Sequence, residues 1–332
     1  MSEQLLSIRG LRTYFDTARG SIAAVDGIDM DIYKGEIVGI VGESGCGKSL
    51  TSLSIMGLNP GRIGEGTICF KGRNLLQLSD KQMQAIRGNE ISMIFQEPMT
   101  SLNPVYTIGQ QLIEAIRLHR RVGRKQARLD AVDMLRQVGI ARPEQLVDEY
   151  PHRLSGGMRQ RVMIAMAMIC EPELLLADEP TTALDVTIQA QILEMMRQLG
   201  QRHQTAILLV THDLGVVAEM CSRVIVMYAG RIVEQGNVRE LFRSPVHPYT
   251  QGLLKSIPTL SAASKRLYSI SGQVPPAGEH GPGCAFAPRC AHAMERCHQA
   301  APQLAWLSAS HASSCWLQPN KEGGAVHASA TN

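Results

Sequence analysis

Short apolar runs recur along most of the chain and are separated by segments with helical periodicity. The runs EIVGIV, EISMIF, ELLLAD, AILLV and RVIVMY occupy residues 36–41, 90–95, 173–178, 206–210 and 223–228. Runs of this length that are rich in Val, Ile and Leu predict buried strands. Because helical segments separate the later runs, we expect an α/β fold with a mainly parallel sheet wrapped by helices.

The N-terminal part of the chain has a different pattern. Residues 5–8, 11–15 and 21–32 read as short strands, and a turn at Lys34 and Gly35 separates them from the first buried run. We therefore expect several strands, but no long helix, before the core sheet begins.

The same patterns suggest how the chain divides. Residues from about 97 to 163 carry helical periodicity and many charges, most clearly over 107–138, which predicts an α-helical subdomain inserted into the core. After Ile257 the composition shifts to Pro, Gly, Ser, Ala and His. We expect a core domain over residues 1–256 and a C-terminal extension over residues 257–332.

The segment GESGCGKS at residues 42–49 fits the pattern G-x-x-x-x-G-K-[ST] and lies between a strand and a helix. Glycines let backbone N–H groups approach phosphates, and the helix N-terminus adds a favourable dipole. Lys48 is expected to neutralise the β- and γ-phosphates, and Ser49 to supply a hydroxyl to Mg²⁺. The residues expected to bind the nucleotide here are Gly42, Ser44, Gly45, Cys46, Gly47, Lys48, Ser49 and Leu50.

Two acidic residues, Asp178 and Glu179, follow the run LLLA about 130 residues after this P-loop. A buried strand delivers them to its carboxyl end, where open α/β sheets bind their ligands. We expect Asp178 to hold Mg²⁺ and Glu179 to act as the general base that polarises the attacking water.

The segment LSGGMRQ at residues 154–160 narrows this interpretation. It resembles the signature motif of ABC ATPases, and it lies just before the acidic pair, as it does in that family. Ser155, Gly156 and Gly157 open a helix and so offer a second anion site. The resemblance implies that two chains pair head to tail, with each signature helix capping the γ-phosphate held by the other chain. It also implies an antiparallel β subdomain beside the core sheet.

Further positions resemble functional residues of the same family. Gln96 corresponds to the Q-loop glutamine, which touches Mg²⁺ and water and joins the core to the helical subdomain. The segment ALD at 183–185 resembles the D-loop, so Asp185 is expected at the dimer interface. His212 resembles the switch histidine, which contacts the γ-phosphate and orients Glu179. The catalytic residues expected from the resemblance are therefore Glu179, His212 and Gln96.

An aromatic residue early in the chain stacks on adenine in this family. Phe15 is the expected residue here, and its neighbour Tyr14 is the alternative.

Two segments resemble the branch of the family that takes up oligopeptides, dipeptides and nickel: EPMTSLNP at 97–104 and HPYT at 247–250. The resemblance implies an ATPase that energises import of peptides or similar small solutes, with another solute, such as a nickel chelate or an exporter cargo, as the alternative. It also implies a second ATPase subunit (a paralogue rather than an identical copy), two integral-membrane permease subunits and an extracytoplasmic solute-binding protein.

Four cysteines are clustered near the C-terminus, at positions 284, 290, 297 and 315. Four thiols in a module with little apolar content suggest a bound metal centre. Their spacing does not distinguish zinc from iron and sulfur, but the uptake branch carries a similar pattern with a [4Fe-4S] cluster. We therefore expect Cys284, Cys290, Cys297 and Cys315 to hold such a cluster in a structural role, with zinc as the alternative.

The composition and the net charge of the chain are consistent with this interpretation. The net charge of +3 is too small to indicate nucleic acid, and none is expected as a partner. A basic run between Arg117 and Arg128 is expected to coat a solvated helix face, with contact to anionic lipid as the alternative.

No apolar run approaches the roughly 20 residues of a spanning helix, and the N-terminus lacks a signal peptide. We expect a peripheral protein at the cytoplasmic face of the bacterial inner membrane.

Other proteins with such a nucleotide site fit less well. A chromosome or DNA-repair ATPase would carry long coiled coils between the P-loop and the signature, where this chain has only about a hundred residues. A translation factor normally carries two such cores. A regulator without turnover would not need Glu179 and His212, and an exporter subunit would lack the peptide-uptake motifs and the cysteine module.

Overall fold

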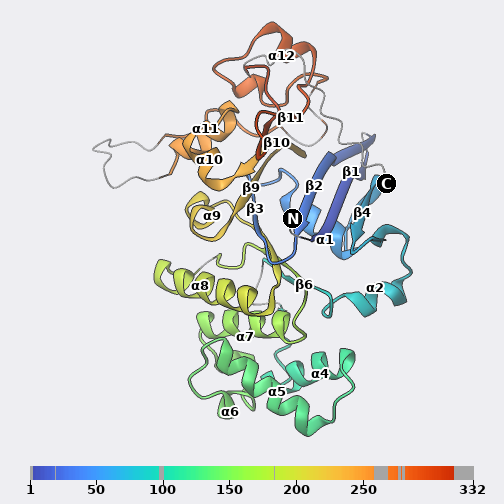
Figure 1. Ribbon diagram of the computed structural model, residues 1–332, viewed down its shortest axis with the longest axis vertical. Helices are drawn as coiled ribbons and strands as arrows, with labels where there is room; N and C mark the ends of the chain where they lie inside the picture. Colours follow the sequence, from blue (N-terminus) through green and yellow to red (C-terminus); the bar gives the residue numbers. More distant parts are fainter. Residues whose placement is uncertain are drawn as a thin grey trace.

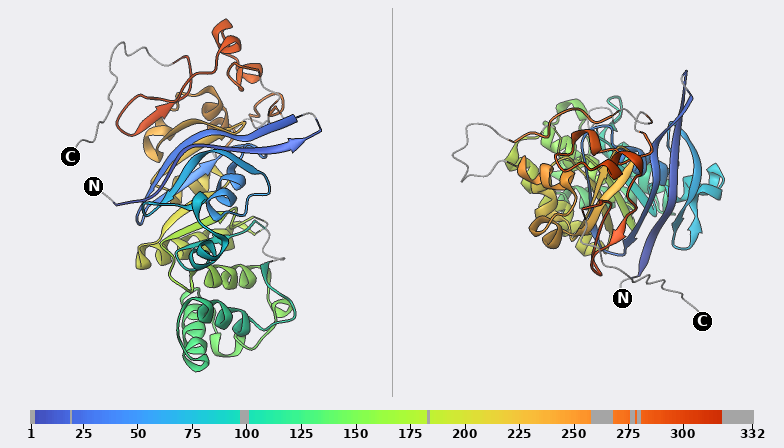
Figure 2. Two further views of the ribbon diagram at one scale, coloured as in Figure 1. Left: turned by 90° about the vertical axis from the view of Figure 1, so that its right-hand side faces the viewer. Right: turned by 90° about the horizontal axis from the view of Figure 1, so that it is seen from above.

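The computed structural model describes residues 3–18, 20–96, 101–182, 184–257, 268–275, 278 and 281–317. These residues form two sheets with helices at their faces, and the helical subdomain and the C-terminal region lie at opposite ends of the long axis (Figures 1 and 2). Four residues of the uptake segment, 97–100, lie outside the described residues, as does Ala183 of the expected D-loop.

The larger sheet carries the expected parallel strands. Within the described residues it has eight strands in the order β11-β12-β10-β9-β3-β8-β7-β6, of which β9, β3, β8, β7 and β6 run parallel. The bounds are β3 Ile37–Val41, β6 Ile91–Ile94, β7 Leu174–Asp178, β8 Ala206–Val210, β9 Arg223–Tyr228, β10 Arg231–Asn237, β11 Ala305–Trp306 and β12 His311–Ser313.

This sheet separates two apolar cores, which explains the continuous apolar runs. Along β7, Leu174 and Leu176 pack into the core shared with the smaller sheet, whereas Leu175 packs into the core shared with the helices. Alternate side chains of a strand point to opposite faces, so both faces must be apolar here. Each fully buried leucine stabilises the fold by about 2 kcal/mol relative to an exposed one.

The smaller sheet is antiparallel, in the order β2-β1-β4-β5. Its strands are β1 Gln4–Thr17, β2 Gly20–Tyr33, β4 Arg62–Phe70 and β5 Arg73–Asn74. The sequence suggested separate strands at 5–8 and 11–15, but β1 is continuous. Gly10, with φ +57°, lies at a register shift and donates its N–H to Asp29 (2.7 Å). The break in the apolar pattern is therefore a bulge, which adds a residue without ending the strand.

The residues expected to form the helical subdomain carry several short helices, and the stretch over 107–138 holds two of them. The helices of the subdomain are α4 Ile108–His119, α5 Arg124–Gln137, α6 Pro143–Leu146, η2 Pro151–Arg153 and α7 Gly156–Met168. Thr107 and Gln110 form a capping box at the start of α4. The basic run spans the break between α4 and α5, and Arg128 pairs there with Asp148 (2.7 Å) at the surface.

The remaining helices cover the sheets. They are α1 Lys48–Met56, η1 Leu75–Gln77, α2 Asp80–Ile86, α8 Val186–His203, α9 Leu214–Met220, α10 Val238–Arg243, α11 Pro248–Lys255, η3 Ala287–Arg289 and α12 Glu295–Gln299. No helix among the described residues is long and apolar enough to cross a bilayer.

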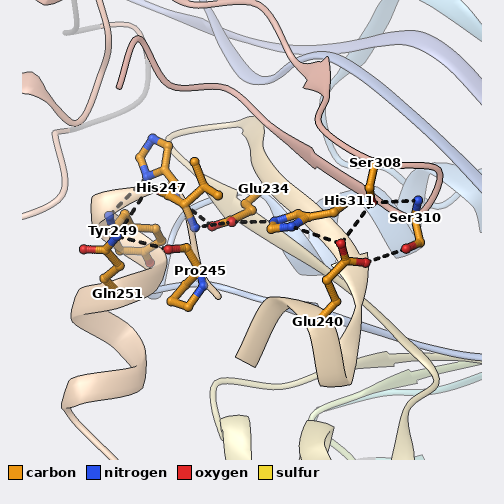
Figure 3. Close-up of polar contacts among 10 residues, drawn as sticks. Glu234, Glu240, Pro245, His247, Tyr249, Gln251, Ser308, Ser310 and His311 are labelled. Atoms are coloured by element: carbon orange, nitrogen blue, oxygen red, sulfur yellow. Dashed lines mark hydrogen bonds and ion pairs between the residues drawn. The ribbon is translucent and has the colours of Figure 1, made fainter. Parts of the chain in front are cut away.

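The C-terminal region is joined to the core sheet, because β12 pairs with β10. Glu234 of β10 lies at this junction and is fully buried. Its carboxylate accepts hydrogen bonds from the backbone N–H groups of Val246 (2.7 Å) and His247 (3.1 Å), and it lies 2.8 Å from Nε2 of His311 in β12 (Figure 3). A buried carboxylate needs such partners, so this residue fastens the C-terminal region to the core.

His247 caps α11 and should make the fold sensitive to acid. It is buried, and burial lowers the pKa of His247 to about 3, against about 6.5 in an unfolded chain. The unfolded chain therefore binds the proton first, so stability is complete above pH 6.5 and falls by about 1.4 kcal/mol for each pH unit below it. Replacing His247 by Asn keeps a capping acceptor for the N–H of Tyr249 (3.1 Å) but removes the titration. Urea unfolding at pH 7.5 and 5.5 should show a loss about 1.4 kcal/mol smaller in His247→Asn; an equal loss in both proteins would contradict this.

Candidate active site

The P-loop connects the end of β3 to the start of α1. At Gly42 an added Cβ would collide with the carbonyl oxygen of Met227 and lie 2.6 Å from Sγ of Cys46. At Gly47 the backbone has φ +100° and a Cβ would lie 2.9 Å from the carbonyl oxygen of Ala24. Glycine is therefore required at both positions, for space at the first and also for conformation at the second.

The lysine of the loop is held inside it. Lys48 is buried and donates hydrogen bonds to the carbonyl oxygens of Gly42 (2.8 Å) and Glu43 (3.0 Å). Glu43 is held in turn by two residues that the sequence did not single out for this role. Its N–H donates to the Oη of Tyr249 (2.8 Å), and its carboxylate pairs with Arg289. Tyr249 belongs to the segment HPYT, which had only marked a family branch.

Ser49 and Asp178 meet at the carboxyl ends of β3 and β7, as the sequence suggested. The hydroxyl of Ser49 donates to Oδ1 of Asp178 (3.0 Å). Burial, together with the charge of Glu179, raises the pKa of the Asp178 carboxyl. A hydroxyl beside a carboxylate is the oxygen donor set that Mg²⁺ prefers, so these two residues fit the expected ion.

The carboxylate of Glu179 is contacted by three side chains, two of which come from other segments. Nδ1 of His212 lies 3.2 Å from Oε1, the hydroxyl of Thr182 donates to Oε2 (2.9 Å), and Nε2 of Gln96 lies 3.4 Å from Oε2. Burial acts to raise the pKa of Glu179, but the hydrogen bonds from His212 and Thr182 outweigh it and lower the pKa. The sequence pointed to all of these residues except Thr182, which no motif marked.

The backbone of Glu179 is also unusual. It has φ +47°, a left-handed conformation that costs a residue with a side chain about 1 kcal/mol or more. Its N–H donates to the carbonyl oxygen of Val210 at the end of β8 (2.9 Å). This conformation turns the chain sharply after β7 and directs the carboxylate toward His212.

The signature residues begin α7 in the helical subdomain. Ser155 is the N-cap and accepts a hydrogen bond from the N–H of Met158 (3.4 Å). Ser155 and Gly156 are exposed, and a Cβ added at Gly156 would meet no other atom within 4 Å. Gln160 is buried and donates to the carbonyl oxygen of Pro180, which connects the signature helix to the segment after β7.

Asp185 caps α8 and accepts from the N–H of Ile188 (2.9 Å). Of the two candidate aromatics, Tyr14 lies under the guanidinium of Arg62, 5.4 Å from the ring centroid. A Cβ added at Gly64 would lie 2.5 Å from this ring. A Cβ added at Gly61 would lie 3.4 Å from the ring of Phe15, so these contacts do not distinguish the two aromatics, and stacking by Phe15 stays a prediction.

The four C-terminal cysteines line one small cavity of about 20 Å³. Burial raises the pKa of Cys284, Cys290 and Cys315, and Sγ of Cys297 accepts from the N–H of Met294 (3.5 Å). In the described part of the chain, however, no group of three or more Cys, His, Asp or Glu side chains is placed to hold a metal ion. The expected metal-binding extension is therefore not confirmed. Of the other cysteines, Cys46, Cys170 and Cys221 are buried and Cys69 is half-buried, as is common for this small apolar side chain.

Comparison with known proteins supports the interpretation of the sequence. The family model described as "ABC transporter" matches residues 25–182, and that described as "Oligopeptide/dipeptide transporter, C-terminal region" matches residues 233–297. The oligopeptide transport ATP-binding protein AppD of Bacillus subtilis is 54% identical over 316 residues, which cover 94% of this chain and 96% of AppD. The chain belongs to the ATP-binding proteins of the oligopeptide and dipeptide ABC transporters.

Other relatives agree with this assignment. The dipeptide transport ATP-binding proteins DppD of B. subtilis and Haemophilus influenzae are 50% and 48% identical, over 98% and 97% of this chain and 98% of each relative. Among solved structures, the dimeric ATP-binding cassette MJ0796 in a post-hydrolysis state bound to ADP and Pi superposes with a TM-score of 0.64 at 26% identity, covering 71% of this chain and 99% of MJ0796. The ABC ATPase fold expected from the sequence is thus confirmed.

The glycines of this ABC ATPase loop should differ in what they tolerate. Gly42→Ala should lower the free energy of unfolding by about 3 kcal/mol, because the new Cβ meets the backbone of β9. Gly45→Ala is the matched control, since it has φ +80° but no atom within 4 Å of the added Cβ, and it should cost only about 1 kcal/mol of backbone strain. Urea unfolding without nucleotide compares the two variants, and equal costs would contradict the steric explanation.

Proposed function

We propose that this chain binds ATP at residues 42–49 and hydrolyses it to energise import of peptides or similar small solutes. One observation carries the proposal: Glu179 lies beside the Ser49–Asp178 pair and is hydrogen-bonded by His212, Thr182 and Gln96. These groups converge where parallel strands end, which is the usual ligand site of such sheets. The peptide cargo is supported by the names of the relatives and by the match to the oligopeptide and dipeptide C-terminal region.

The chain's own residues would act as follows. The N–H groups of the P-loop and the ammonium of Lys48 hold the phosphates, with Lys48 exchanging its carbonyl partners for phosphate oxygens. Ser49 and Asp178 would hold Mg²⁺, which supplies charge neutralisation at the phosphates. Glu179 takes a proton from the attacking water, and His212 orients this carboxylate. Gln96 connects the site to the helical subdomain. Phe15 stacks on the adenine ring.

The proposed assembly uses the signature residues. Ser155, Gly156 and Gly157 would cap the γ-phosphate held by a second ATPase subunit (a paralogue of this chain), and Asp185 would lie at that interface. Support comes from the open space around Gly156 and from the exposed start of α7. ATP-driven closure of this dimer would act on two permease subunits, to which an extracytoplasmic solute-binding protein would deliver the solute. The chain would be peripheral on the cytoplasmic face of the membrane.

The cysteine region would form a structural module within residues 257–332, beside a core of residues 1–256 with its helical subdomain at about 97–163. We include in the proposal a [4Fe-4S] cluster held by Cys284, Cys290, Cys297 and Cys315, with zinc as the alternative. It is supported by the donor chemistry of four thiols that line one cavity.

Glu179→Gln tests the assignment of the general base. The variant should bind ATP with a Kd within about threefold of wild type but lose at least about 100-fold in ATP hydrolysis, because the amide cannot take the proton. Steady-state phosphate release, with and without co-purified membrane subunits, measures this. Glu171→Gln is the matched control at the opposite end of β7, and it should retain wild-type activity. Turnover at the wild-type rate in Glu179→Gln would refute the assignment.

Metal analysis tests the cluster. Full-length chain purified without oxygen should contain about four iron and four sulfide per chain, and Cys297→Ser should lose them while Cys69→Ser retains them. Stoichiometric zinc would identify the alternative, and neither metal in the wild-type chain would exclude the centre.

A further inference from the structure

A residue of the C-terminal region reaches the nucleotide loop. Arg289 ends η3, between Cys284 and Cys290, and its side chain is only 5% exposed. Its Nη1 and Nη2 atoms donate to the two carboxylate oxygens of Glu43 at 2.5 and 3.0 Å. This two-bond arrangement of a guanidinium on a carboxylate is both strong and directional. The pair joins positions 246 residues apart in the chain.

The guanidinium of Arg289 is fixed from several sides. Nε donates to the carbonyl oxygen of Ser271 (3.0 Å), and Nη2 also approaches that of Ile270 (3.4 Å). The rings of Tyr228 and Phe286 lie within 6 Å of its central carbon. Because these contacts fix the position of the guanidinium, it restricts in turn the position of the carboxylate that it binds.

Glu43 passes this constraint to the residue that holds phosphate. Its carbonyl oxygen accepts from Lys48 (3.0 Å) and from the N–H of Cys46 (3.3 Å), and its own N–H is fixed by Tyr249. A shift of Glu43 would therefore displace both the loop and the ammonium of Lys48. Glu43 itself is the x that follows the first glycine of the motif, where the pattern imposes no residue type.

We propose that Arg289 is a positioning residue for the P-loop, so that the C-terminal region sets the affinity of this chain for nucleotide. The inference rests on the proposed binding of ATP at residues 42–49. Arg289 touches neither substrate nor reacting atoms; it keeps the loop in the conformation that binds phosphate. Its loss should therefore raise the KM for ATP and leave kcat almost unchanged, since Glu179 and His212 are not part of the contact.

A double-mutant cycle on the full-length chain tests this coupling. Titration with a fluorescent ATP analogue should give a Kd at least tenfold higher for Arg289→Met and for Glu43→Met, and the double variant should be no weaker than either single variant. Arg289→Lys keeps the charge but cannot make both bonds, so its Kd should be intermediate. Tenfold corresponds to about 1.4 kcal/mol. ATP hydrolysis at saturating ATP should stay within twofold of wild type in Arg289→Met and Arg289→Lys.

Controls separate this idea from its alternatives. Arg296 stacks on Trp316 in the same region, 3.5 Å from the ring centroid, and Arg296→Met should retain the wild-type Kd. If Glu43→Met fails to fold, Glu43→Gln, which keeps the shape of the side chain, takes its place in the cycle. Wild-type Kd in Arg289→Met, or strictly additive effects in the cycle, would overturn the proposal. If Lys48→Ala binds ATP like wild type, the proposed ATP binding at residues 42–49 is refuted. If Lys48→Ala loses binding while Arg289→Met does not, only the positioning role of Arg289 is refuted.

Discussion

The loop between β3 and α1 carries Lys48 and Ser49, and Ser49 bonds to Asp178 of the acidic pair. Contacts from Tyr249 and Arg289 to Glu43 hold this loop. The pair between Arg289 and Glu43 is a charge-assisted contact with two hydrogen bonds, in which the guanidinium is almost fully buried and the carboxylate is 30% exposed. The remaining groups follow from the sheet. The carboxyl ends of parallel strands lie at one edge of the sheet, so the topology alone brings the residues after β6, β7 and β8 near the loop.

The parts of this structure that the sequence predicted are those coded locally. A strand buried on both faces needs a continuous apolar run, and a P-loop needs glycines where backbone atoms leave no room, as at Gly42. Such patterns occupy adjacent positions, so they can be recognised in a sequence. The residues around Glu179 were found for a different reason: family motifs marked Gln96 and His212, whereas Thr182 had no motif and was missed.

Contacts between distant segments were not predictable in this way. Nothing near Arg289 in the sequence indicates that it pairs with Glu43, and HPYT does not reveal that Tyr249 receives an N–H from the P-loop. The same limit explains the C-terminal region. A shift in composition suggested a C-terminal extension, but it did not show that β12 of this extension pairs with β10 or that His311 contacts the buried Glu234. Composition describes what a segment contains and not which edge strand it joins.

The position of the site between two ends of the molecule gives these contacts their significance. From the helical end, Gln96 contacts Glu179, and Gln160 of the signature helix contacts Pro180 next to it. From the C-terminal end, Tyr249 and Arg289 contact Glu43. The strained backbone of Glu179 is held by the bond from its N–H to Val210, and its carboxylate is contacted by Gln96 and His212. Under the proposed function, ATP bound at this loop would therefore lie between contacts from both ends: those of Gln96 and Gln160 from the helical subdomain, and those of Tyr249 and Arg289 from the C-terminal end.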